Sequence, residues 1–509
     1  MMGRMILGVA LSLVMTHVAN ADELTPNQQK GKEVYDRRCA GCHGAEGGGD
    51  GPAADRLRPR PRNFKAAKYK FTFNQFGKLP QDSTIAKWIA DGLPGTSMPG
   101  WKDLLSEQDI RNVVAYIKTF SKKFERAEKA GEPPAPIKIG SPPKWTEDDI
   151  KRGRELFQKN CEKCHGEAGR GSGPSAVGLK DDLGDRIWPR NLTKGWTFRG
   201  GNAPGDIYRT VAGGITGTPM PAHLSASPEE KGAMTEEEIW KVVGYVNTIV
   251  QREQPQIKEV VVSKLVLGAL PGDPKDERWS QIEPRYFPMV SQIIEGDRWF
   301  KTTLESVFVR SMYNDKEIAI LVEWDDPSNS PLPQPNEQFP ENEPDAFAIQ
   351  LPTTIPSGME KPYFLGGSDK TPVTLWKWAN GQEPEVLRGK GILKTEKAQG
   401  ERRTVKVKTD YATGRWRAVF TRPLKAAAPD DLSFEIGKYI PIAFSAWDGN
   451  NAEKAEKRAI TIWYWLLLEP QTEMTVYLFP AFAGLLIAAG EAVLVVRTRT
   501  RNNDRGLKS

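Results

Sequence analysis

Histidine and cysteine are both scarce in this sequence, with four of each among 509 residues. One histidine, His17, lies close to the N-terminus, so three remain for chemistry in the rest of the chain. So few histidines and cysteines provide few possible ligands for a zinc centre and few possible bases for a nucleophilic triad. The net charge of +6 is too small over this length to indicate a nucleic-acid partner. The composition therefore points away from hydrolases, zinc enzymes and nucleic-acid-binding proteins.

The cysteines nevertheless follow a strict pattern. All four lie in two copies of a Cys-x-x-Cys-His motif, formed by Cys39, Cys42 and His43 in the first copy and by Cys161, Cys164 and His165 in the second. This motif is the attachment signature of c-type haem. Two thiols on one helical turn can bond to the two vinyl groups of the porphyrin, and the adjacent imidazole can bind the iron. A redox dithiol or a zinc site is the alternative, and the repetition makes it the weaker one. We predict two covalent haem c groups.

The sixth ligand of each iron is predicted to be a methionine, since His223 is the one histidine left and is expected at the surface. Met98 lies in a Gly-Thr-Ser-Met-Pro segment and Met220 in Gly-Thr-Pro-Met-Pro, and each follows its motif histidine by 55 residues. Core packing is the ordinary role of a single methionine. Matched loops at matched spacing favour iron ligation instead, and a thioether ligand raises the haem potential.

The matched spacing also indicates an internal duplication. Each copy has a Gly-rich loop after its motif and then an arginine followed by asparagine, Arg62 or Arg190. These arginines could hydrogen-bond haem propionates, and a solvated arginine is the equal alternative. We predict two all-α cytochrome c domains, residues 26–123 and 144–252, joined by a Pro-rich linker, residues 124–143.

The two ends of the chain carry membrane-related signals. Residues 1–21 have the charge, apolar stretch and small-residue site of a secretory signal peptide. Residues 474–496 are apolar enough and long enough for a transmembrane helix, and the basic tail of residues 497–509 is expected on the cytoplasmic side. We therefore expect an exported protein with its bulk in the periplasm, anchored in the cytoplasmic membrane by one C-terminal helix.

Residues 257–469 have a different pattern. Short runs of β-branched and aromatic residues are separated by Pro, Gly, Asn and Asp, which is typical of an antiparallel β-sandwich. The predicted strands are Ile257–Leu267, Leu304–Arg310, Ile318–Trp324, Ala346–Leu351, Arg415–Arg422, Ile440–Trp447 and Ala459–Leu468. This region contains no cysteine, so no disulfide bond can stabilise the domain.

Several blocks of this region resemble the haem-b-binding gamma subunit of ethylbenzene dehydrogenase. Its relatives serve dimethyl sulfide dehydrogenase, selenate and chlorate reductases and nitrite oxidoreductase. The blocks are ILVEWDDP (320–327), DAFAIQLP (345–352), PYFLGG (362–367), PVTLWKW (372–378) and AFSAWDGN (443–450). The resemblance implies one non-covalent haem b held by a methionine and a lysine. Leu365 stands where that methionine is expected, which leaves Met359 as the nearest substitute, and Lys454 and Lys457 are the candidate lysines.

The resemblance also implies a function. It indicates a membrane-anchored electron-transfer subunit of a molybdenum oxidoreductase of the dimethyl sulfoxide reductase family, most like a nitrite oxidoreductase or nitrate reductase gamma subunit. Electrons would pass between an iron–sulfur subunit and a soluble cytochrome c or terminal oxidase, and no catalytic residues are expected in this chain. Two alternatives stay open: a stand-alone dihaem enzyme of the peroxidase or thiosulfate dehydrogenase type, and a scaffold whose sandwich has lost haem b.

Overall fold

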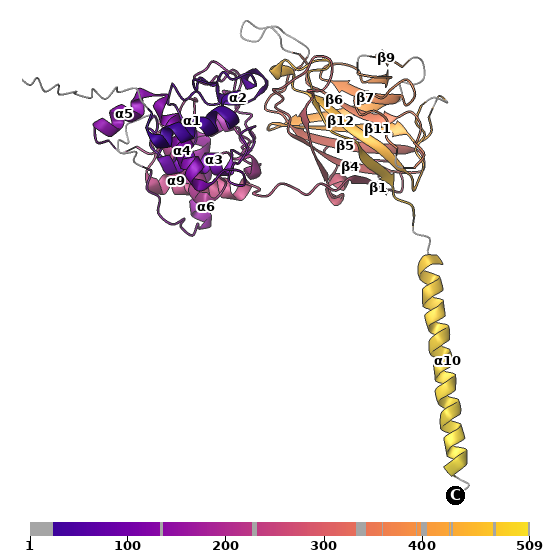
Figure 1. The fold of residues 1–509 in the computed structure, drawn as a ribbon. Coiled ribbons are helices and arrows are strands. Elements are labelled where there is room, and N and C mark those ends of the chain that lie inside the picture. The colour runs from indigo at the N-terminus through magenta and orange to yellow at the C-terminus, as the bar shows by residue number, and fades with distance from the viewer. Residues whose placement is uncertain are drawn as a thin grey trace, which may run out of the picture. The chain divides into compact units, whose positions relative to one another are not determined.

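A computed structural model describes residues 24–506 except 133–135, 226–231, 332–342, 359, 393, 399–404, 427, 429–430 and 472–474. The predicted signal peptide and Met359 lie outside the described residues. The chain forms two compact units, each described here by itself. The first unit comprises residues 1–160, 179–187 and 194–252, and the second comprises residues 161–178, 188–193 and 253–509. Figure 1 shows the helical part in indigo to pink and the strands in rose to yellow.

The first unit is helical. Its helices are α1 (Pro26–Arg38), α2 (Ala40–His43), α3 (Asp82–Asp91), α4 (Glu107–Thr119), α5 (Lys122–Lys129), α6 (Glu147–Asn160), α8 (Pro204–Gly213) and α9 (Glu236–Ile249). Capping boxes begin α1, α4 and α9, because Thr25, Ser106 and Thr235 each accept a hydrogen bond from the backbone three residues later. The structure thus confirms the helical class predicted for this part. Helix α5 occupies the start of the segment predicted as a linker, since Phe124 is buried in the first core.

The duplication extends to how the helices cross. Helix α1 packs against α4, and α6 packs against α9. At each crossing a glycine faces the backbone of the partner helix. A Cβ on Gly31 would lie 2.0 Å from the oxygen of Asn112, and one on Gly153 would lie 1.9 Å from the oxygen of Lys241. Both crossings therefore require glycine, because backbone atoms cannot move aside as a flexible side chain can.

Replacing either crossing glycine by alanine should destabilise its domain. We expect Gly31→Ala or Gly153→Ala to cost about 1–3 kcal/mol through overpacking, in spite of the better helix propensity of alanine. Denaturant unfolding of the purified protein, followed by haem absorbance, measures the effect. Gly140→Ala is the matched control, since no atom lies within 4 Å of a Cβ there. Equal midpoints for Gly31→Ala and Gly140→Ala would contradict the crossing geometry.

The second unit is built on strands. They are β1 (Val260–Leu265), β2 (Arg285–Pro288), β3 (Val290–Ser291), β4 (Ser306–Tyr313), β5 (Glu317–Asp325), β6 (Ala346–Pro352), β7 (Val373–Ala379), β8 (Glu385–Gly389), β9 (Thr395–Lys397), β10 (Lys406–Ala412), β11 (Arg415–Pro423), β12 (Tyr439–Trp447), β13 (Ala459–Ile460) and β14 (Tyr464–Leu468). The short helix α7 (Glu162–His165) also belongs to this unit.

The strands follow the order β10-β11-β5-β4-β1-β14-β12-β6-β7-β8-β9. Strand β12 is shared: Tyr439–Ile442 pair with β14, and Ala443–Trp447 pair with β6. The sheet therefore consists of two half-sheets joined through β12. One contains β10, β11, β5, β4, β1 and β14, and the other contains β6, β7, β8 and β9. Nearly all pairs are antiparallel, as predicted, but β1 runs parallel to both β14 and β4, which makes the sheet mixed.

One hydrophobic core takes side chains from both half-sheets, including Trp324 and Phe420 from one and Phe347 and Trp376 from the other. Strand β5 is buried along both faces, because a second cluster with Trp279 covers its outer side. The run predicted as one strand, Ala459–Leu468, is divided: β13 pairs with the far half of β12 and β14 with the near half.

Helix α10 (Thr475–Gly506) follows the strands as one long helix, drawn in yellow in Figure 1. Residues Leu478–Thr498 are long enough and apolar enough to cross a membrane, with none of the window buried against the rest of the chain. This agrees with the predicted span of residues 474–496, of which Met474 is outside the described residues.

Candidate functional site

The two Cys-x-x-Cys-His motifs adopt the same local structure. Each forms a helix of four residues, α2 or α7, that begins directly after the first cysteine. The backbone nitrogen of His43 lies 2.9 Å from the oxygen of Cys39, and that of His165 lies 2.9 Å from the oxygen of Cys161. A single turn therefore presents two thiols and one imidazole together, which is the arrangement that covalent haem attachment needs.

The first thiol of each motif, Cys39 or Cys161, does not have the lowered pKa of a reactive redox cysteine. All four cysteines are free. Burial raises the pKa of Cys39 to about 11 and that of Cys161 to about 12, so both hold their protons near neutral pH. Redox-active cysteines have lowered pKa values instead. The local chemistry thus favours attachment over thiol–disulfide exchange.

A backbone carbonyl orients each motif histidine. The Nδ1 atom of His43 lies 3.1 Å from the oxygen of Arg62, and that of His165 lies 3.0 Å from the oxygen of Arg190. A carbonyl oxygen can only accept, so Nδ1 carries the proton in both rings. Nε2 is then the unprotonated nitrogen that can bind iron. Burial also lowers the pKa of His43, which favours the neutral ligand form.

A glycine brings that carbonyl-bearing segment close to the motif in both copies. A Cβ on Gly49 would lie 2.7 Å from the oxygen of Pro61, and one on Gly171 would lie 2.5 Å from the oxygen of Pro189. Both glycines have positive φ, +75° and +82°. Their amides donate to the carbonyls of His43 and His165 at 2.8 and 2.7 Å. The Gly-rich loop is therefore the device that holds the histidine and its acceptor together.

The two methionine loops are also copies of one structure. The hydroxyl of Thr96 donates to Leu93 at 2.8 Å and accepts from the amide of Met98 at 3.1 Å. Thr218 does the same with Ile215 and Met220, at 2.8 and 3.2 Å. The threonine was visible in the repeated Gly-Thr-x-Met-Pro segment, but the sequence alone does not reveal that it fixes the methionine backbone.

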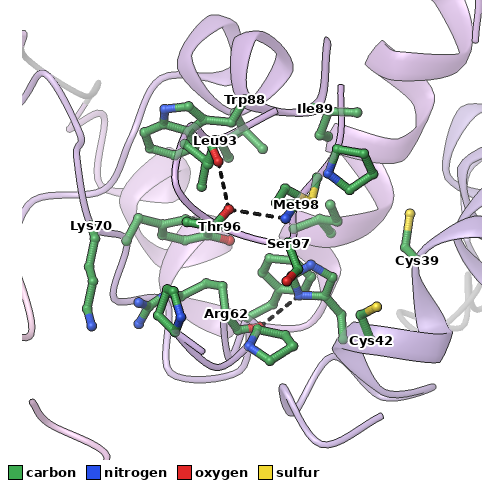
Figure 2. A pocket seen from close by; sticks show the side chains of 18 of the residues that line it. Cys39, Cys42, Arg62, Lys70, Trp88, Ile89, Leu93, Thr96, Ser97 and Met98 are labelled. Atoms are coloured by element: carbon green, nitrogen blue, oxygen red, sulfur yellow. Dashed lines mark hydrogen bonds between the residues drawn. The ribbon is translucent and has the colours of Figure 1, made fainter. Parts of the chain in front are cut away.

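One cavity brings the residues predicted for the first haem together. Cys39, Cys42, His43, Arg62 and Met98 all line it, and Figure 2 shows Met98 across the cavity from the two cysteines. Its walls are mostly apolar, from Leu57, Phe64, Tyr69, Ile85, Trp88, Ile89, Leu93, Trp101, Val113 and Ile117. The residues present fit a haem c: Cys39 and Cys42 would hold it covalently, and His43 and Met98 would be available to bind its iron.

Of the residues predicted for the second haem, the motif and Arg190 lie in the second unit and Met220 lies in the first. The guanidinium of Arg190 donates to Glu305 at 3.1 Å. His223, predicted at the surface, is instead buried with 7% of its surface exposed, and its Nδ1 lies 2.8 Å from the oxygen of Gly232. The surface prediction for His223 was wrong, because Gly232, shortly before α9, lies against the ring.

The first cavity also receives residues from the second predicted cytochrome domain. Arg199 lines it and donates to the oxygen of Gly95 in the methionine loop at 3.4 Å. The ammonium of Lys70, which also lines it, lies 2.9 Å from the carboxylate of Asp181, with only 11% and 6% of the two side chains exposed. Burial lowers the pKa of Arg62, while the nearby charge of Asp182 opposes that shift. The second domain therefore contributes to the charge around the first site.

Removing the charge of Arg199 should lower the potential of the first haem, because a positive charge near the iron favours the ferrous state. We expect Arg199→Leu to shift one midpoint downward by tens of millivolts, as estimated for one charge at roughly 10 Å with a dielectric constant of about 20. Potentiometric titration of the purified protein measures the shift. Arg152→Leu, at an exposed position of the same domain, is the control. Identical midpoints in the two variants would rule out the cross-domain effect.

The candidate haem b ligands are less favourably placed. The ammonium of Lys454 lies 2.9 Å from Glu343, a pairing that favours the charged form, whereas a lysine ligand must be neutral. The Nζ of Lys457 lies 5.7 Å from the centre of the Trp299 ring. Leu365 is buried with Ile392 and Ile460. The placement of Lys454 does not fit ligation, and Met359 is outside the described residues.

Comparison with known families agrees with this division of the chain. A cytochrome c family model matches residues 28–121 and again residues 150–249. A model described as ethylbenzene dehydrogenase matches residues 384–459, which run from the end of the β7–β8 turn to β13. The resemblance to that family is thereby confirmed, although this second match covers only part of the strand-built second unit, which we call the β unit.

Three curated proteins illustrate the similarity. A putative respiratory nitrate reductase heme subunit of Haloferax mediterranei is 27% identical over 48% of this chain and 86% of its own. The gamma subunit of chlorate reductase from Ideonella dechloratans is 26% identical over 30% of this chain and 59% of its own. Cytochrome c-554(547) of Halothiobacillus neapolitanus is 34% identical over 18% of this chain and 91% of its own. This chain thus spans little more than half of the chlorate reductase subunit.

Proposed function

We propose, from the premise that this chain belongs to the cytochrome c family through two domains, that it is the dihaem electron-transfer subunit of a membrane-bound molybdenum oxidoreductase complex. In this proposal, Cys39, Cys42, Cys161 and Cys164 bind two haem c groups covalently. His43 with Met98 would bind the iron of the first haem, and His165 with Met220 would bind that of the second. The observation that carries the proposal is the duplicated geometry of motif, carbonyl and methionine loop.

The haem irons supply the chemistry, each carrying one electron, and the protein supplies attachment, ligands and surroundings. The apolar walls of the first cavity would keep water away from a haem iron bound there. The Thr96 and Thr218 loops hold the methionine backbones in place. These features suit a relay rather than an enzyme, because a fixed methionine leaves no open iron position for a substrate.

Contacts within each unit suggest an order for the relay. In the second unit, the haem-motif segment is held on the strands: Arg170 lies 3.5 Å from Asp325, and Asn191 donates to the same carboxylate at 3.2 Å. In the first unit, residues of the second cytochrome domain reach the first cavity, as described for Arg199 and Asp181. We propose that the second haem would be the first to exchange electrons with a partner docked on the β unit, and that the first haem would follow it in the relay.

The partners follow from the relatives. Proteins similar to this chain are named as subunits of nitrate and chlorate reductases. We propose that the β unit docks an iron–sulfur subunit of such an enzyme, most like a nitrite oxidoreductase or nitrate reductase. The first haem then exchanges electrons with a soluble cytochrome c or a terminal oxidase. Export of the chain, anchoring through α10 and a cytoplasmic basic tail complete the proposal.

A haem count tests this proposal most directly. A pyridine haemochrome assay on the purified protein should give two haem c per chain, and the same spectrum measures any haem b. Both haem c groups should be low-spin and six-coordinate. A high-spin signal from one of them would favour a stand-alone dihaem enzyme over a relay.

Isolation from native membranes tests the partners. Affinity purification in mild detergent should recover molybdenum and iron–sulfur proteins together with this chain. A complex that forms with two haem c and no haem b would assign the β unit a docking role alone. Recovery of the chain without any molybdenum or iron–sulfur protein would contradict the proposed complex.

A further inference from the structure

Three aspartates that are far apart in the sequence meet at one end of the β unit. Asp326 directly follows β5, Asp345 directly precedes β6, and Asp448 directly follows β12. Strands β6 and β12 are paired, with Ala346 opposite Trp447, so Asp345 and Asp448 are neighbours by register. Strand β5 belongs to the other half-sheet and brings Asp326 to the same place. The cluster thus joins the two half-sheets.

The three side chains are completely buried, each with 0% of its surface exposed. One carboxylate oxygen from each lies within 4.8 Å of those of the other two. Protein oxygens bind calcium at about 2.3–2.6 Å, so two ligands of one ion stand at most roughly 5 Å apart. The spacing of the three oxygens therefore fits a shared calcium ion.

Hydrogen bonds position the cluster but leave one of its oxygens, on Asp326, without a partner among the described residues. Asp345 accepts from the amides of Ser330 and Gly449, at 2.7 and 2.9 Å, and from the indole of Trp416 at 3.2 Å. Asp326 uses one oxygen to accept from the amide of Ser328 at 3.0 Å. Its other oxygen, Oδ2, is buried and has no hydrogen-bond partner among the described residues. An unpartnered carboxylate oxygen in such a place is costly unless a cation offsets it.

The groups around the cluster supply no positive charge that could offset it. Burial first, and then the charges of Asp345 and Asp448, raise the pKa of Asp326. Glu453, with 1% of its surface exposed, offers no positive charge to the cluster. Its carboxyl group accepts a hydrogen bond from the amide of Asp448 at 3.1 Å, and burial raises its pKa to about 8. Tyr411 is the nearby neutral group, and its hydroxyl donates to the backbone oxygen of Asp326 at 3.1 Å. No lysine or arginine ion pair to Asp326 or Asp345 occurs in the described part of the chain.

We propose that Asp326, Asp345 and Asp448 bind a calcium ion that fastens the two half-sheets together. Calcium suits the site better than magnesium, because calcium accepts all-protein carboxylate cages, whereas magnesium keeps several waters in a strict octahedron. None of the three aspartates is among the residues assigned to the two haems.

The calcium site is also connected, through neighbouring residues, to the segment that carries the second haem motif. Asp325, next to Asp326, is the carboxylate that holds Arg170 and Asn191 of the second haem segment. The amide of Asp326 donates to Gly414 at 3.1 Å, and Thr413 accepts from Arg170 at 3.0 Å. A calcium ion on Asp326 would therefore stabilise the edge on which this segment rests.

Metal analysis of the full-length protein in detergent tests the site. After dialysis against buffer without chelator, the wild type should retain one calcium per chain. EGTA should remove it and lower the unfolding temperature, and calcium chloride should restore that temperature whereas magnesium chloride should not. Calorimetric titration of the EGTA-treated protein with calcium chloride then gives the affinity.

Asp326→Asn is the informative variant, because it keeps the shape and removes the charge. We expect calcium to bind this variant at least about tenfold more weakly, since the number of charged ligands tunes calcium affinity. Asp315→Asn, at an exposed position in the β4–β5 turn, is the matched control and should bind as the wild type does. If Asp326→Asn fails to fold, the chelator experiment on the wild type still decides. A wild type without bound calcium whose unfolding temperature ignores EGTA and calcium would overturn the site, as would unchanged affinity in Asp326→Asn.

Discussion

Replacing Met98 by alanine should lower the midpoint potential of one haem by about 0.2 V, a fraction of the roughly 0.8 V over which axial ligands set haem potentials. A thioether favours ferrous iron, so its loss stabilises the ferric state. Water could then reach the iron in a cavity whose other walls are apolar. The same change at Met220 should lower the other potential by a similar amount.

Potentiometric titration and optical spectra read out both effects. The variant haem should become high-spin, while the second haem keeps its wild-type midpoint. Met234→Leu is the control, because Met234 is buried in the second cytochrome domain without belonging to a repeated loop. Unaltered midpoints in both Met98→Ala and Met220→Ala would reject methionine as the ligand in the two sites.

Changing Cys39 and Cys42 together to serine should remove one of the two covalent haems and leave the other. The serine hydroxyl does not form the thioether bond, and α2 holds both thiols of the first site. We expect the haem c content per chain to fall by half. Mass spectrometry of the proteolytic peptides should then find haem only on the peptide with Cys161 and Cys164.

The reciprocal change at Cys161 and Cys164 is the matched comparison and should leave haem on the first motif only. This pair of variants also separates folding from attachment, because each retains one intact site. A variant that keeps both haems, or loses both, would contradict two independent attachment sites.

Local features of the haem sites could be predicted from the sequence, because short segments determine them. The motifs and the equal spacing of the two methionines depend on residues that are near in the sequence. The carbonyl acceptors of His43 and His165 could not be predicted, since a backbone atom leaves no trace in residue type. Arg199 was also missed, because its role depends on how two domains pack.

The strands of the β unit were harder to predict, because their pairing depends on segments that are far apart in the sequence. Strand β7 (Val373–Ala379) was recognised only as a block of resemblance, and β8, β9 and β10 were not predicted at all. Strands β8–β10 contain charged residues and have partly exposed positions, so their apolar pattern is weak. The parallel pairing of β1 joins segments about two hundred residues apart. Neither that pairing nor the meeting of Asp326, Asp345 and Asp448 has a local signal.

The pairing of β1 with β14 has a consequence for how the chain is made. Val260–Ser263 pair with Trp465–Leu468, and Glu469 donates its amide to Ser263 at 3.1 Å. During synthesis from the N-terminus, β1 cannot pair with β14 until β14 has been made, which happens only shortly before α10 is made. The β unit would therefore close as the anchor is being produced. A water-soluble version of the protein should accordingly end after Glu469, because an earlier stop would remove the strand that completes the sheet.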